Sequence, residues 1–67
     1  MAKFLPGDLV QYENLKMEIE YLLVLSVEQI VNQQEIYTAW YFDRGKKGPF
    51  HYFPNEAEYY AIVSRAE

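Results

Sequence analysis

Residues 35–43 read Glu-Ile-Tyr-Thr-Ala-Trp-Tyr-Phe-Asp, and this stretch decides the fold class. Six of the nine are β-branched or aromatic, the side-chain types that fit a pleated, half-buried surface. Because side chains alternate between the two sides of a strand, the stretch has two distinct faces. One face holds Ile36, Thr38, Trp40 and Phe42, and the other holds Tyr37, Ala39 and Tyr41. We predict a strand over residues 35–43 with Trp40 as its core anchor.

Residues 17–27 predict a second strand. Every odd position from Met17 to Val27 is apolar or aromatic, a period of two that indicates a strand with one buried face. Leucine and glutamate also favour helix, but this spacing does not fit 3.6 residues per turn. Leu22 and Val24 fall on the opposite face beside two glutamates, so they predict an exposed or self-associating patch.

Turn signals divide the rest of the chain into three shorter strands and their connections. Pro6 and Gly7 mark a turn before the first of these strands, since proline presets its backbone angle and glycine accepts a positive one. The predicted strands cover residues 8–12, 49–53 and 59–64, with polar breaks at 13–16 and 32–34 and a glycine-containing hairpin at 44–48. A short 3-10 turn is expected near residues 55–58, with Asn55 as its candidate cap.

The length and the strand pattern together restrict the architecture. A chain of 67 residues supports a single hydrophobic core, and the absence of cysteine excludes disulfides and zinc–thiolate sites. Five short strands without a long helix to cover them need another way to bury one face and protect their edges. We therefore predict one all-β domain over residues 1–67, a small five-stranded SH3-like barrel.

The residue inventory argues against catalysis and cofactor binding. His51 is the single histidine, and Ser26 and Ser64 stand in predicted strands without a catalytic motif around them. His51, Glu56 and Glu58 match no metal-ligand spacing. We expect a non-enzymatic protein with no catalytic residue, no metal and no cofactor.

Targeting signals are also missing from the sequence. Its longest mainly apolar stretch, residues 21–27, is far shorter than the roughly 18 residues of a candidate membrane span. The residues after Met1 contain no apolar signal-peptide core. We expect a cytoplasmic protein with no membrane association, and Met1 as its native start.

Several short motifs occur in the order found in a known family. They are Pro6-Gly7-Asp8-Leu9-Val10, Lys16-Met17-Glu18-Ile19, Tyr37-Thr38-Ala39-Trp40-Tyr41-Phe42-Asp43 and Phe53. With these the chain resembles the small bacterial YodC-like proteins over most of its length, which implies an SH3-like barrel of no established activity. The chain departs from that pattern by lacking a glycine-rich stretch before the Lys-Met pair and by a longer, more apolar second strand. The Gly7-Asp8 opening also resembles that of KOW and Tudor-like barrel modules, where the acid fixes nearby amides, and this resemblance implies a structural role for Asp8.

The hairpin at residues 44–48 reverses the local charge of an acidic chain. The chain has a formal net charge of −4, yet Arg44, Lys46 and Lys47 stand together with no acidic residue among them. Cations beside aromatic side chains are typical of single-stranded nucleic-acid binding. Three cations release few counterions, however, and a charged hairpin also serves simply as a soluble turn that discourages edge pairing.

Aromatic residues make up 18% of the chain, more than we expect one small core to absorb. Exposed tyrosines suit partner recognition, although small barrels also use them to cover a thin core. We predict a binding or adaptor module whose partner is another protein or a second copy, with nucleic acid as the alternative and no small-molecule substrate. The candidate binding residues are Tyr37, Tyr41, Arg44, Lys46, Lys47 and Tyr52.

Overall fold

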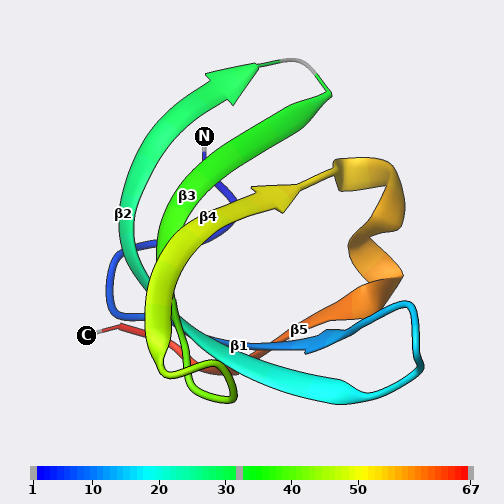
Figure 1. The fold of residues 1–67 in the computed structure, drawn as a ribbon. Coiled ribbons are helices and arrows are strands. Elements are labelled where there is room, and N and C mark those ends of the chain that lie inside the picture. Colours follow the sequence, from blue (N-terminus) through cyan, green and yellow to red (C-terminus); the bar gives the residue numbers. More distant parts are fainter. Residues whose placement is uncertain (1, 32, 67) are drawn as a thin grey trace.

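A computed structural model describes residues 2–31 and 33–66 and shows an all-β chain (Figure 1). Its elements are β1 (Leu9–Glu13), β2 (Ile19–Val31), β3 (Gln34–Tyr41), β4 (Lys46–Tyr52), the 3-10 helix η1 (Pro54–Tyr59) and β5 (Tyr60–Ser64). All five strands form one sheet in the order β4-β3-β2-β1-β5, and neighbouring strands are antiparallel. The prediction of five strands in an all-β chain is confirmed.

The sheet is strongly curved but not closed (Figure 1). Within residues 2–31 and 33–66, β4 and β5 are the two edges and do not pair, and η1 carries the chain from one edge to the other. The predicted barrel is therefore confirmed only as a curved five-stranded sheet. The predicted 3-10 turn is also present, but Asn55 does not cap it. Phe53 is the N-cap residue, and Pro54 is the first residue of the helix.

Several predicted boundaries differ from those in the structure or lie outside the described residues. β2 extends to Val31, beyond the predicted end at residue 27, and β4 starts at Lys46 rather than at residue 49. Met1 and Asn32, the predicted start and part of the predicted break at 32–34, lie outside the described residues. In the described part of the chain, no helix is long and apolar enough to cross a membrane.

The buried faces of β2 and β3 are the opposite of those predicted. Leu22 and Val24 are fully buried, so they form no exposed patch, whereas Trp40 is 36% exposed and is not the core anchor. Beyond Val24, β2 also carries two register shifts, between Val24 and Ser26 and between Val27 and Gln29. A β-bulge breaks the period of two, so no single face of residues 17–27 stays inside.

The core is built mainly of aromatic rings. Phe4 lies edge-on to Tyr37 and Tyr52, with ring centroids 5.5 and 5.1 Å apart, and Phe50 stacks on Tyr37 at 5.6 Å. The buried core residues are Phe4, Val10, Leu22, Val24, Tyr37, Ala39, Tyr41, Phe50 and Tyr52. Edge-to-face and offset pairs at these separations add attraction beyond the burial of apolar area. The core thus absorbs more aromatic side chains than the sequence led us to expect.

Asp8 ties both ends of the chain to the sheet. Its fully buried carboxylate accepts hydrogen bonds from the backbone amides of Leu5 at 3.0 Å and Ala66 at 2.7 Å. Arg65 adds an ion pair, with its Nη1 3.7 Å from Oδ2. The predicted structural role of Asp8 is confirmed, since one side chain satisfies amides that are 61 positions apart in the sequence.

We predict that Asp8→Ala lowers the free energy of unfolding by about 2–4 kcal/mol, because it leaves two amides without their acceptor. Urea denaturation followed by circular dichroism measures the change. The exposed Asp43 provides the control, and Asp43→Ala should change stability by less than about 0.5 kcal/mol. Equal effects of the two substitutions would contradict the role of Asp8.

Candidate functional site

The loop between β1 and β2, residues 14–18, is held in one conformation by Asn14. The side-chain oxygen of Asn14 accepts hydrogen bonds from the amides of Lys16 at 2.9 Å and Glu18 at 3.0 Å. The backbone adds Asn14 N–H to Glu18 O and Met17 N–H to Asn14 O, both at 2.9 Å. Met17 takes a left-handed backbone conformation with φ of 62°. These bonds fix a short loop that would otherwise sample many conformations.

This loop places two apolar side chains in solvent. Leu15 is 100% exposed and Met17 is 79% exposed. A hollow lies on each side of the loop, and both hollows are lined in part by Leu15. The loop and the two hollows are the candidate functional site.

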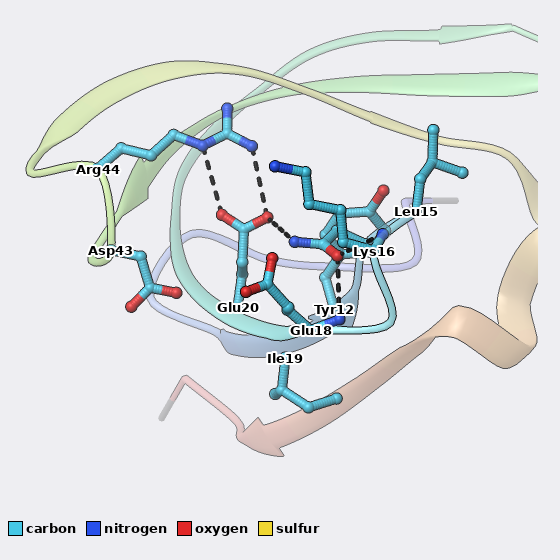
Figure 2. A pocket seen from close by; sticks show the side chains of 9 residues that line it. Tyr12, Leu15, Lys16, Glu18, Ile19, Glu20, Asp43 and Arg44 are labelled. Carbon is cyan, nitrogen blue, oxygen red and sulfur yellow. Dashed lines mark hydrogen bonds and ion pairs between the residues drawn. The ribbon is translucent and has the colours of Figure 1, made fainter.

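The first hollow, which we call the charged hollow, has a volume of about 590 Å³ and carries charges of both signs (Figure 2). It is lined by Tyr12, Asn14, Leu15, Lys16, Glu18, Ile19, Glu20, Asp43 and Arg44. The nearly buried Glu20 accepts a hydrogen bond from Asn14 Nδ2 at 3.1 Å and pairs with Arg44, whose Nε lies 3.3 Å from Oε1. The carboxylate of Glu20 is thus already paired with a cation.

The second hollow, which we call the aromatic hollow, lies between the loop and η1 and has a volume of about 340 Å³. Figure 1 shows the loop and η1 at the same end of the molecule. The aromatic hollow is lined by Tyr12, Glu13, Asn14, Leu15, Met17, Glu56, Tyr59 and Tyr60. The rings of Tyr12 and Tyr60 stack at a centroid distance of 5.0 Å and an angle of 16°.

Carboxylates supply the formal charge of the aromatic hollow. Glu13 ends β1 and Glu56 lies in η1, so they come from two sides, and no lysine or arginine lines this space among the described residues. Burial, together with nearby Tyr12 and Glu56, raises the pKa of Tyr60 to about 12. Its neutral hydroxyl donates to the carbonyl oxygen of His51 at 3.3 Å.

The three tyrosines predicted to bind a partner are core residues. Tyr37, Tyr41 and Tyr52 are less than 10% exposed, which corrects the expectation that they stand on the surface. The Tyr37 hydroxyl accepts from the amide of Phe4 at 3.1 Å and donates to Glu35, and burial raises its pKa above the ordinary value. All three rings are buried, and the hydroxyls of Tyr37 and Tyr41 make hydrogen bonds at the margin of the core, an arrangement that suits a thin sheet.

The predicted basic cluster is divided by the fold. Arg44 turns back to Glu20, and its guanidinium carbon lies 4.5 Å from the ring centre of Tyr41. Lys46 and Lys47 are exposed and belong to β4, in which successive side chains point to opposite faces. The structure therefore does not bring the three cations to one surface.

Exposed aromatic residues do occur on the outer face of the sheet, at positions that the predicted faces excluded. Tyr21 is 42% and Phe42 is 51% exposed, and the amide of Phe42 donates to the carbonyl of Tyr21 at 3.2 Å. Trp40 lies across from Leu23 on the same face. The sequence pattern missed them because it assigned this face to the core.

His51 and the acidic residues outside the two hollows form no metal-binding group within the described part of the chain. His51 is exposed, and its Nδ1 lies 2.8 Å from the side-chain oxygen of Gln34. In residues 2–31 and 33–66, no three histidine, aspartate or glutamate side chains are grouped to hold a metal ion.

Leu15, Met17 and Tyr59 were not among the predicted site residues. A sequence signal was available for Leu15, because it is an apolar residue within the predicted polar break at 13–16, whereas Met17 was assigned to the predicted strand over residues 17–27. The exposure of two neighbouring apolar side chains, Leu15 and Met17, makes this loop a candidate interaction surface.

Comparisons with protein-family models, with curated proteins and with solved structures found no match. The resemblance to YodC-like proteins therefore stays a prediction. The functional proposal rests on the geometry of the loop and its two hollows.

We predict that Asn14→Ala loosens the loop and lowers the free energy of unfolding by about 1–2 kcal/mol, since the amides of Lys16 and Glu18 lose their acceptor. Hydrogen exchange should then accelerate at these two amides. Asn55→Ala is the matched control, because Asn55 makes no capping hydrogen bond in η1. Unchanged exchange at both amides would show that Asn14 does not order the loop.

Proposed function

We propose that this chain is a small, non-enzymatic protein-interaction module that contacts its partner through residues 14–18 and the aromatic hollow. The observation that carries the proposal is the full exposure of Leu15 and the large exposure of Met17 on a loop fixed by hydrogen bonds. Apolar side chains held in solvent have no folding role. They contribute free energy when a partner covers them.

The rigidity of the loop supports this assignment. Ordering a flexible loop at an interface costs conformational entropy, and a preformed loop avoids most of that cost. The apolar tip is surrounded by Glu13, Glu18 and Lys16, which gives the arrangement of an apolar centre and a polar rim found in protein interfaces. The chain is acidic overall, so it favours a partner segment with cationic and apolar residues.

The linings of the two hollows support a non-enzymatic role. Among the described residues their polar groups are carboxylates, phenols, one amide, the Lys16 amine and the Arg44 guanidinium, with no histidine, serine or threonine. An activated nucleophile needs a positioned base beside it. The curved five-stranded sheet with its 3-10 helix before the last strand supports the further proposal that the fold is SH3-like. The cytoplasmic location stays a prediction.

A second candidate function is nucleic-acid binding through Lys46 and Lys47. Lys47 lies directly across from Trp40, which places a cation and a partly exposed ring on neighbouring strands. Such pairs can combine phosphate contact with base stacking. The ion pair of Arg44 with Glu20 removes the third cation, which makes this the weaker candidate.

Photo-crosslinking from positions 15 and 17 in the full chain tests the protein-binding proposal. We expect crosslinks to one distinct protein, which is then purified and titrated by calorimetry. Leu15→Ser with Met17→Asn should weaken its affinity at least about tenfold, since buried apolar anchors carry most of the binding energy. Asparagine is chosen because it tolerates the left-handed backbone at Met17.

The matched control is Ile30→Ser with Val31→Ser, two exposed apolar residues at the end of β2. An equal loss of affinity in both variants would show that the loop has no special role. A crosslink between two copies of this chain would contradict the cationic partner and indicate self-association.

Fluorescence anisotropy with a labelled oligothymidine tests the second candidate. If the strand binds at low salt, Lys46→Glu with Lys47→Glu should abolish binding, and added salt should weaken it in the original chain. Lys3→Glu with Lys16→Glu makes the same change in net charge at other positions and should bind more tightly than the first variant. No binding by the original chain at low salt would rule this candidate out.

A further inference from the structure

We infer that the aromatic hollow holds the cationic side chain of a lysine or arginine from the bound partner. This inference rests on the proposed function and names the chemistry that the site recognises. Three features of the hollow carry it: its aromatic walls, its uncompensated carboxylates and its size.

The walls of the hollow suit a cation attached to an apolar stem. Tyr12 and Tyr60 form a stacked pair, and Tyr59 is 46% exposed beside them. A cation near an aromatic face is attracted by the negative charge distribution of the ring. Leu15 and Met17 offer apolar surface for the methylene groups of a long side chain, whose charged end stays near polar groups.

The charge of the hollow selects a cation over a neutral group. Glu13 and Glu56 line it from β1 and η1, and neither makes an ion pair within the described residues. The neighbouring charged hollow is different, because Arg44 already forms an ion pair with Glu20 and Lys16 adds a positive charge that would repel a cation. Two hollows flank one loop, and the aromatic hollow is the one that offers free carboxylates without a competing cation.

The size of the hollow limits the ligand to a single side chain and its adjacent backbone. Its volume of about 340 Å³ lies at the small end of the range for ligand pockets, roughly 300–1,000 Å³. The loop beside it is fixed by Asn14, so the site exists before a ligand binds. A preformed site of this size recognises one residue of a peptide.

The test is a nuclear magnetic resonance titration of the whole chain with three blocked amino acids at low salt. The probes are the Nα-acetyl methylamides of lysine, arginine and norleucine, the last being a neutral analogue of the lysine stem. Lysine and arginine should shift the amides of Tyr12, Glu56, Tyr59 and Tyr60, and should bind at least about fivefold more tightly than norleucine.

Substitution of the two carboxylates gives the decisive comparison. Glu13→Gln with Glu56→Gln should weaken lysine binding about tenfold and abolish the preference over norleucine. Glu28→Gln with Glu58→Gln removes the same number of charges at residues that line neither hollow and should retain the preference. The amide spectra show in the same experiment that each variant is folded.

The inference is overturned if norleucine binds as tightly as lysine, if the shifts centre on Glu20 and Arg44, or if both double variants behave alike. Its failure is separate from a failure of the proposed function. If positions 15 and 17 crosslink to a partner but the hollow does not prefer lysine or arginine, the inferred cation site is wrong and the proposed interaction module stands. A lysine preference without any crosslinked partner would leave the site and contradict the module.

Discussion

The pairing of β2 with β3 sets the position of every other element. Leu22 lies across from Tyr41 and Val24 across from Ala39, and these residues are buried on one side of the sheet. A register shift then follows Val24, so the inward face of β2 changes from even to odd positions. The same inward face continues into β1, where the buried Val10 lies across from Leu22. Trp40 lies across from Leu23 on the opposite face and is therefore partly exposed.

The functional proposal follows from where that sheet ends. β1 and β2 must be joined by a tight turn, and Asn14 supplies the acceptor that closes it. On the other side η1 connects the two edges of the open sheet and comes to lie beside this turn. An open sheet therefore creates a hollow at its end, with aromatic walls contributed by Tyr12 and Tyr60.

The sequence predicted the number and approximate positions of the strands, but it predicted the wrong buried face for β2 and β3. Strand positions depend on local residue types and on punctuation by proline and glycine, and these are legible at 6–8 and 44–48. The predicted binding residues Tyr37, Tyr41 and Tyr52 were wrongly placed because their rings pack into the core of the folded sheet, where the hydroxyls of Tyr37 and Tyr41 find acceptors. Leu15 was missed because the break at 13–16 was treated only as a connection, and Met17 was missed because it was assigned to the predicted strand, which starts at Ile19 instead.

The sequence by itself determined an all-β chain and the approximate limits of its strands, because both depend on residues close in the chain. Its Gly-Asp motif also indicated a structural Asp8, but only the packed fold brings Ala66 and Arg65 to that carboxylate. The tertiary structure alone decided which face is buried and which residues share a surface. Glu13 and Glu56 line one hollow although they are 43 positions apart. Such a meeting depends on strand register and on the path of the chain across the open sheet, which no local pattern encodes.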